Sequence, residues 1–472
     1  MSMSRSVPAL AVLMLSGCVV NPPDSRIGEG GSAPGRWTAT KQAEAGVDTQ
    51  WVDRFGDRKL KKLVAESYDS NRDLRAAAAR VERSAAFAKG AGAAARPQVT
   101  AALNSNRQKQ AFVGLPVGGG AGGGGVLSSI SESYGSSLNV SWEPDLWGKV
   151  RAGEQAALAD LEAQGYTYRG ARASLAAQVV RAYFLLAEAN EQIVLAENAL
   201  QVRLDTVDLV RGRFEAAVED GNGSAAQLRL AETDVDTARE ELSRRQGERD
   251  QAKRQLEILL GRYPAGTVEG AGLPKIPSRP PAGLPSELLL RRPDILTAER
   301  RLAAAGKRSK EARLAFYPSF TLTGGAGTTS NELSGIFDSD FGVWSIAGQV
   351  AQPILRGGAL KSQVEISDAE EREALANLQQ TVLNGFGEVE IALAAERYLA
   401  ERTKSIADAV EHARESALAA ERDFALGTGD VLTLLAAQTR RITLASQQVT
   451  LRRLRLDNRV NLHLALGGDY KI

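Results

Sequence analysis

The sequence lacks most of the residues from which enzymes build active sites. It contains one cysteine, Cys18, and two histidines, His412 and His463. Without a second cysteine no internal disulfide can form, so the stability of the fold must come from packing. Both histidines fall in stretches that we expect to be long helices, and solvated positions explain them better than a shared metal. The chain also has no nucleophile elbow centred on serine and no phosphate-binding loop, so we expect no enzymatic activity and no cofactor.

Net charge and long apolar runs are also scarce. The net charge is +1 and aromatic residues make up 5% of the chain, so neither a nucleic-acid partner nor a large aromatic core is indicated. After Leu15 there is no run of about 18 apolar residues, which excludes a transmembrane helix. If the protein crosses a membrane, it must do so as a closed β-barrel, because only that alternative pairs every backbone polar group in lipid.

Proline is absent from two stretches of about 119 residues, 145–263 and 354–472, and a proline inside a helix costs about 3 kcal/mol. A glycine-containing break divides each stretch, at residues 220–223 and at residues 427–429. We therefore expect each stretch to form a pair of long antiparallel helices. Apolar residues seven apart, among them Val179, Leu186 and Ile193, indicate coiled-coil packing.

Matches between the two halves of the chain indicate an internal duplication. Asn71-Arg-Asp73 returns as Arg292-Pro-Asp294, and Leu146-Trp-Gly148 returns as Arg356-Gly-Gly358. The offset falls from about 221 to about 210 residues, so the first copy has the longer hairpin, with a glycine-rich loop at residues 117–126. Two copies of one unit favour a scaffold or conduit over an enzyme with a single pocket.

The duplication predicts where the structural units begin and end. Each repeat should contain a helix, a β-hairpin and two long helices, and a proline-rich linker should join the repeats. We place the repeats at residues 51–265 and 291–472, with the linker at 266–290. The hairpins should lie at about residues 97–144 and 318–353, and the long helices at 146–261 and 356–467.

The predicted strands raise the question of what completes the sheet. Residues 99–104 and 320–323 alternate apolar and polar side chains, as half-buried strands do. Four strands cannot close a barrel, for which about eight is the practical minimum, but three copies would supply about twelve. The alternative is an ordinary small sheet packed on helices, and the strands alone do not separate the two. The aromatic residues near strand ends would suit a membrane-interface girdle: Trp142, Trp147, Tyr317, Phe341 and Trp344.

The N-terminus has the pattern of a bacterial lipoprotein signal, predicted at residues 1–17. Leu15-Ser16-Gly17-Cys18 resembles a lipobox, in which the cysteine is acylated and becomes the new N-terminus. Val19 stands where an aspartate would indicate retention at the inner membrane, so we expect the outer membrane. Residues 18–50 would then form a lipidated tether. The alternative is a chance cysteine in an apolar stretch.

Several separate motifs together resemble the TolC-type outer membrane efflux family, in particular its lipid-anchored OprM/NodT branch. The resemblance covers nearly all of the chain after the tether. The motifs occur in the family's order: Asn71-Arg-Asp-Leu-Arg-Ala76, Ser141-Trp-Glu-Pro-Asp-Leu-Trp-Gly148, Arg291-Arg-Pro-Asp294, Gln352-Pro-Ile-Leu-Arg-Gly-Gly358 and Glu388-Val389.

The resemblance implies a mainly α protomer with a small β part. Three protomers would form one tunnel, made of an outer-membrane β-barrel of about twelve strands and a periplasmic barrel of about twelve helices. Family members have no catalysis of their own. They dock with a periplasmic adaptor and an inner-membrane pump, here expected to be of RND type, and conduct drugs, toxic compounds or metabolites outward.

The resemblance also places the adaptor contacts and the gate at the two glycine-containing breaks. Leu426-Gly427-Thr428 resembles the family's tip motif, and Val218, Gly221 and Gly223 belong to the first-half tip, which has an insertion. The aspartate ring of the family falls here on Thr433 and Ala436, with only Asp430 acidic nearby. For Asp430 a helix N-cap after Gly429 is the favoured alternative to a gate residue. Phe424 and Gly429 replace a tyrosine–arginine latch, so we expect packing rather than charge to hold the gate.

A second hypothesis is a coiled-coil lipoprotein of the periplasm that forms no channel and acts as an adaptor or envelope scaffold. An adaptor should have lipoyl-like or β-barrel domains on either side of one helical hairpin. This chain instead duplicates its strand pairs, which favours the channel.

Overall fold

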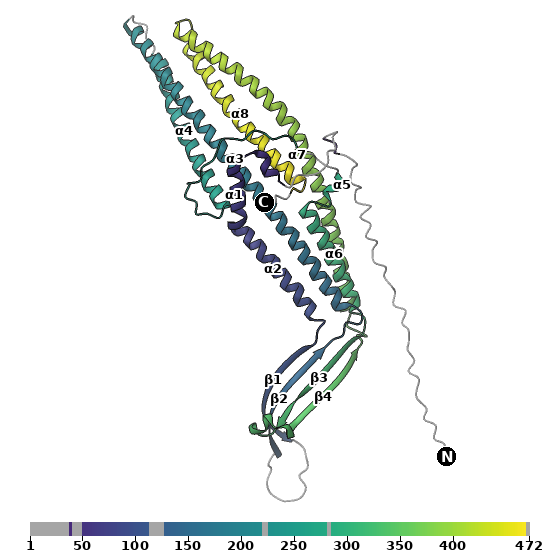
Figure 1. The fold of residues 1–472 in the computed structure, drawn as a ribbon. Coiled ribbons are helices and arrows are strands. Elements are labelled where there is room, and N and C mark those ends of the chain that lie inside the picture. The colour runs from purple at the N-terminus through teal and green to yellow at the C-terminus, as the bar shows by residue number, and fades with distance from the viewer. Residues whose placement is uncertain (1–36, 40–49, 113–126, 220–224, 281–284, 469–472) are drawn as a thin grey trace, which may run out of the picture.

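The computed structural model describes residues 37–39, 50–112, 127–219, 225–280 and 285–468. The molecule is elongated, with long helices at one end and a single sheet projecting from the other (Figure 1). Among the described helices, none combines the length and hydrophobicity that a membrane span requires. The predicted signal peptide, Cys18, nearly all of the tether and the glycine-rich loop lie outside the described residues.

The helices follow one another in the same order in both halves of the chain. A helix of 22 residues leads into a β-hairpin in each half, and two long helices follow the hairpin. Helix α3 alone has 71 residues, which at 1.5 Å per residue is about 105 Å. The helices are α1 (Arg58–Ser70), α2 (Arg72–Ala93), α3 (Lys149–Glu219) and α4 (Ala225–Leu259), then α5 (Pro285–Leu288), α6 (Pro293–Leu314), α7 (Ala359–Ala425) and α8 (Val431–Ala465), with short 3₁₀ helices η2 (Trp51–Phe55), η3 (Leu333–Phe337) and η4 (Ser339–Phe341).

The strands β1 (Gln98–Phe112), β2 (Leu127–Trp142), β3 (Ser319–Ser330) and β4 (Gly342–Ala351) form one antiparallel sheet in the order β1-β2-β3-β4. This confirms the predicted mainly helical fold with four strands. Pairing of β2 with β3 joins the two hairpins into this sheet. Strand β1 continues well beyond the alternating stretch because β2 pairs with it along its whole length.

Equivalent positions in the two halves tie the short helix to the end of the last long helix. Asn71 caps α2 by accepting a hydrogen bond from Leu74 N at 3.0 Å, and its Nδ2 donates to Leu259 O at 2.9 Å. In the second half, Arg292 is buried at the start of α6 and its Nη1 donates to Ala465 O at 3.1 Å. The duplication therefore preserves a contact while changing the chemistry that makes it.

The largest core lies where α1, α3, α4 and α8 meet, with Trp51 and Phe184 completely buried in it. The predicted seam residues Val179, Leu186 and Ile193 are also buried. The expectation that both histidines are solvated is wrong for His463. This side chain is 0% exposed, and its ring stacks on Trp51 with 5.5 Å between the centroids. Because Trp51 comes from the opposite end of the chain, no local pattern predicts the contact.

Candidate functional site

The sheet has one apolar face and one polar face. Paired residues of an antiparallel sheet lie on the same side, and successive residues of a strand point to opposite sides. The pairs Val99 with Val140, Val140 with Gly324 and Gly324 with Ile346 therefore define a single face that crosses all four strands. The apolar side chains of this face lie toward the helices, and they are Val99, Leu103, Leu138, Val140, Trp142, Phe320, Leu322, Trp344, Ile346 and Val350. Farther from the helices the same face carries Arg107, Lys109 and Glu132, and Arg107 pairs with Glu132 at 3.0 Å.

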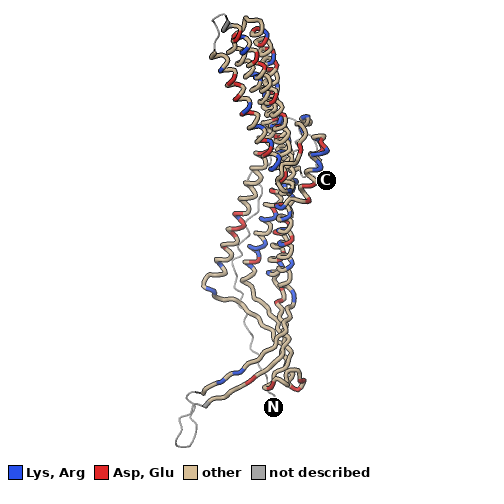
Figure 2. Tube along the Cα trace, turned by 90° about the vertical axis from the view of Figure 1, so that its left-hand side faces the viewer, with Lys and Arg blue, Asp and Glu red and all other residues tan. Residues whose placement is uncertain are grey.

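The apolar face is open to its surroundings in the single chain. Ile346 is 81% exposed and Trp344 is 79% exposed, and all ten residues of β4 are exposed. An apolar surface of this extent normally marks contact with a membrane or another protein. Charged residues are dense along the helices and sparse on the sheet (Figure 2). With Phe112 and Val343 as exceptions, the opposite, polar face carries mostly small and polar residues: Thr100, Asn104, Ser137, Asn139, Ser141, Thr321, Thr323, Ser345 and Gln349.

The turn between α7 and α8 contains the predicted second-half tip. Gly427 has φ of 85°, a left-handed conformation that favours glycine. The backbone N–H groups of Thr428 and Gly429 both donate to Asp423 O, at 3.0 and 2.9 Å. A Cβ atom on Gly429 would lie 2.8 Å from Phe424 N. The turn therefore requires glycine at both positions.

Asp430 is the N-cap of α8 in this structure. Its Oδ2 accepts hydrogen bonds from Leu432 N at 3.1 Å and from Thr433 N at 3.3 Å. A carboxylate in this position satisfies free N–H groups and faces the positive end of the helix. Thr433 itself is exposed, as are Leu426 and Thr428. Within the described chain the carboxylate of Asp430 therefore has a structural function.

Phe424 is buried and links the two halves of the chain at the tip. Its side chain is 3% exposed and packs in a cluster with Val210 of α3 and Leu434 of α8. The guanidinium carbon of Arg213, on α3, lies 4.0 Å from the centre of the Phe424 ring, and its Nη2 donates to Phe424 O. Our sequence reasoning missed Arg213, because one arginine on an arginine-rich helix has no distinguishing local pattern.

The predicted first-half tip is described only in part. Helix α3 ends at Glu219, and Val218 lies in its last turn. Helix α4 begins at Ala225. Gly221 and Gly223 lie outside the described residues. The structure therefore places the second-half tip residues around one turn and leaves their relation to Gly221 and Gly223 as a prediction.

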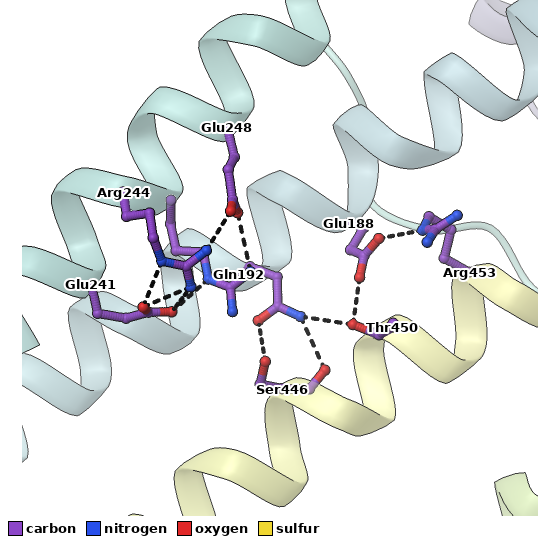
Figure 3. A network of polar contacts seen from close by, with 9 residues as sticks. Glu188, Gln192, Glu241, Arg244, Glu248, Ser446, Thr450 and Arg453 are labelled. Carbon is purple, nitrogen blue, oxygen red and sulfur yellow. Dashed lines mark hydrogen bonds and ion pairs between the residues drawn. The ribbon is translucent and has the colours of Figure 1, made fainter.

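Polar contacts join α3 to α8 below the tip (Figure 3). Gln192 Nε2 donates to Ser446 O at 3.0 Å, and Ser446 Oγ donates to Gln192 Oε1 at 2.8 Å. One turn of α3 away, Glu188 accepts from Thr450 Oγ1 at 2.6 Å and pairs with Arg453. These contacts hold the first-half and second-half helices side by side.

The same seam contains a buried arginine nearer the tip. Arg203 of α3 donates from Nη1 to Gln438 Oε1 at 2.9 Å and from Nη2 to Thr439 Oγ1 at 2.6 Å, and Asp234 of α4 lies 3.3 Å from Nη1. Burial lowers the pKa of the Arg203 guanidinium, while the charge of Asp234 acts in the opposite direction. Three helices are thus tied together by one side chain.

Comparison with known proteins agrees with this geometry. Residues 63–262 and 284–468 match the outer membrane efflux protein family. The toluene efflux pump outer membrane protein TtgF of Pseudomonas putida is 31% identical over 426 residues, which cover 90% of this chain and 86% of TtgF. The probable outer membrane lipoprotein SilC of Salmonella typhimurium is 29% identical over 427 residues, covering 90% and 88%. The solved structure of the outer-membrane channel OprN gives a TM-score of 0.84 at 27% identity, covering 94% of this chain and 98% of that one.

Long helical hairpins joined to a sheet with one apolar and one polar face define the protomer of an outer-membrane channel. The chain belongs to the outer membrane efflux protein family, and it is an outer membrane efflux channel of tripartite pump systems. This confirms the family resemblance, the outer-membrane location and the channel function. The family is not enzymatic, which agrees with the expected lack of catalysis. Membership of a family of outer-membrane channels also excludes the hypothesis of a periplasmic adaptor without a channel.

Proposed function

We propose that three copies of this chain assemble into one duct. Substances delivered by a periplasmic adaptor and an inner-membrane pump of RND type would leave the cell through it. The two repeats, which we place at residues 51–265 and 291–472, would each contribute one hairpin to the membrane part and one pair of long helices to the periplasmic part.

The observation that carries this proposal is the two-faced sheet with open edges. Strands β1 and β4 are the outer strands of the described sheet, and each pairs on one side only. Open strand edges invite pairing, and a closed barrel removes them. Three sheets joined from β4 to β1 would give about twelve strands, above the practical minimum for a barrel. The apolar face would then contact lipid, and the polar face would line the duct.

We propose that Cys18 is lipidated and that its lipid lies in the outer membrane. Cys18 is outside the described residues, but the chain that follows it docks on the helices. Trp37 is 3% exposed in a cluster with α5, α6 and α7 residues, and Glu390 of α7 accepts hydrogen bonds from Thr38 N and Ala39 N at 2.6 and 2.9 Å. The name of the relative SilC as a lipoprotein supports the same view.

We propose that the tips of the long helices bind the adaptor and close the periplasmic mouth. Leu426 is 79% exposed and Leu432 is 59% exposed, which suits contact with a partner. Phe424 is buried instead, so it would hold the turn rather than touch the partner. Val218, Gly221 and Gly223 would supply the first-half part of this surface.

The test is the assembly state and conductance of the full chain purified in detergent. Size-exclusion chromatography with light scattering should give a protein mass slightly below three times 50.2 kDa, because the signal peptide at residues 1–17 would be removed from each copy. Planar bilayers should record discrete channels, with wider openings when the tip is loosened. A stable monomer, or trimers without conductance in every tip variant, would contradict the proposal.

A further inference from the structure

A cavity of about 250 Å³ lies where the sheet meets the helices. It is lined by the turn after β2 (residues 143–149), the turn before β3 (residues 314–320) and the turn after β4 (residues 351–356). Both repeats thus contribute to its walls. Phe320 and Val350 are paired on the apolar face, and Phe320 also lines the cavity. Ser319 and Ala351, a pair on the polar face, line it as well. The cavity therefore lies at the end of the sheet, and through Phe320 it borders the surface that the proposed function places in lipid.

Aromatic rings and backbone hydrogen bonds make the cavity wall rigid. The ring of Trp147 lies 5.3 Å from the ring of Tyr317 and 6.5 Å from that of Phe320. Its Nε1 donates to Pro318 O at 2.7 Å. Gln352 Nε2, in the turn after β4, donates to Phe316 O in the turn before β3 at 3.0 Å. The wall is therefore formed before any ligand arrives.

Two cations, Lys149 and Arg356, line the cavity together with the carboxylate of Glu143, and this carboxylate is largely free to bind a ligand. The guanidinium of Arg356 makes no ion pair within the described chain. Lys149 Nζ is 4.0 Å from Glu143 Oε1, at the outer limit of an ion pair. The second carboxylate, Asp145, already accepts hydrogen bonds from Val150 N and Arg151 N at 3.2 and 2.8 Å, where it caps α3.

Two exposed apolar residues precede Arg356 in the turn after β4, although they do not line the cavity. Ile354 is 87% exposed and Leu355 is 88% exposed, immediately before Arg356. A cavity lined by two cations, a carboxylate and Phe320, with exposed apolar residues in the same turn as Arg356, matches the parts of a zwitterionic phospholipid. Arginine and lysine bind phosphate oxygens, a carboxylate binds an ammonium group, and apolar side chains cover the first methylenes of the acyl chains.

We propose that this cavity binds the headgroup of a phosphatidylethanolamine-type phospholipid in the periplasmic leaflet of the outer membrane. The phosphate lies between Lys149 and Arg356, and the primary ammonium faces Glu143. The acyl chains run past Phe320 onto the apolar face. This inference rests on the proposed function, because it requires the apolar face to contact lipid.

The test measures lipid retained by the full-length protein after detergent purification. Native mass spectrometry would compare phosphatidylethanolamine, phosphatidylcholine and phosphatidylglycerol with identical acyl chains. The wild type should retain phosphatidylethanolamine about tenfold better than the other two, since choline cannot donate hydrogen bonds and glycerol has no cation. Glu143→Gln should remove this preference alone. The double variant Lys149→Gln with Arg356→Gln should lower retention of all three lipids about tenfold, and Arg356→Lys should restore part of it.

Lys361→Gln is the matched control. Lys361 is an exposed cation of α7 that pairs with Glu365 at 3.7 Å and does not line the cavity, so retention should not change. Equal lipid retention by the double variant and the wild type would overturn the inference, as would an unchanged preference in Glu143→Gln. So would a peptide from another copy of the chain cross-linked into the cavity. If the wild type conducts normally but retains the three lipids equally, the lipid site is rejected and the proposed duct stands. If the wild type retains phosphatidylethanolamine selectively but does not conduct, the proposed duct is rejected instead.

Discussion

The guanidinium of Arg213 lies 4.0 Å from the centre of the Phe424 ring and so joins α3 to the end of α7. The same side chain donates to Phe424 O, so one residue in the first half of the chain holds the turn between α7 and α8 in the second half. The two long hairpins reach their tips at the same end of the molecule (Figure 1), and this clasp between Arg213 and Phe424 connects them near those tips. A contact of this kind limits how far the tips can separate.

Arg213→Ala should loosen the tip, because it removes a cation–π contact and a hydrogen bond worth about 1–2 kcal/mol together. We expect a larger or more frequently open channel in planar bilayers. The control is Arg211→Ala, since Arg211 is half-exposed and its ion pairs, with Asp208 at 3.3 Å and with Glu232 of α4 at 3.9 Å, stay within its own hairpin. Equal conductance of the two variants would show that the clasp does not restrain the mouth.

Glycine at the tip should be intolerant of substitution. Gly427→Ala places a Cβ at φ of 85°, which costs about 1 kcal/mol. Gly429→Ala brings the new atom 2.8 Å from Phe424 N, so the turn must shift. Both variants should be cut faster at the tip by limited proteolysis. Gly387→Ala, where a Cβ meets nothing within 4 Å in α7, should leave the cleavage rate unchanged or slower.

The two faces of the sheet should respond oppositely to the same charge. Ile346→Arg puts a guanidinium on the apolar face, which costs about 2–4 kcal/mol at the middle of a bilayer. We expect little of this variant in purified outer membranes. Ser345→Arg, one residue earlier on the polar face, should assemble normally and shift the ion selectivity of the channel toward anions. Equal membrane levels of both variants would contradict the assignment of the faces.

Glu257 should make stability depend on pH. This carboxylate is 1% exposed and accepts hydrogen bonds from Gly266 N, Thr267 N and Val268 N at 2.6, 2.7 and 3.0 Å. Burial alone would raise the pKa of Glu257, but these hydrogen bonds outweigh it and hold the pKa below the ordinary 4.5. The ionised form therefore stabilises the fold above that pH, and this contribution is lost as pH falls below it.

The substitution Glu257→Gln should lower the free energy of unfolding at pH 7 by about 1–3 kcal/mol, which a lower midpoint of urea unfolding would show. The difference in stability between the variant and the wild type should shrink as pH falls below 4.5. There the wild-type carboxyl becomes protonated, first in the unfolded state and then in the folded state, and its charge no longer favours folding. Glu411→Gln, at an exposed residue of α7, should have little effect at either pH. A difference that stayed constant from pH 7 to pH 3 would contradict this account.

Local features of the chain were predictable because they depend on neighbouring residues. The absence of proline predicted helices as long as α3 and α7, and the turn at Gly427 follows from the conformations open to glycine. The strands were predicted too short, because alternation of apolar and polar residues is visible only over part of β1. Beyond Asn104 the strand persists through its hydrogen bonds with β2.

Contacts between distant segments were not predictable from one sequence. Nothing near Arg213 indicates that Phe424 lies under it, and nothing near Trp51 indicates that His463 is buried against its ring. The cavity where the sheet meets the helices is likewise lined by Lys149 and Arg356, which lie in different halves of the chain. Each of these depends on how α3, α7 and α8 pack, which is set by the sum of many weak contacts.

By itself, the sequence determined the class of fold, the duplicated order of helices and hairpins, and the family. These follow from the periodicity of apolar residues, the positions of proline and glycine, and motifs that lie within a few residues of one another. Only the tertiary structure decided that the two hairpins share one sheet with an apolar and a polar face, and that Arg213 clasps Phe424. The physical reason is that strand register and helix packing bring together residues whose separation along the chain has no bearing on their distance in space.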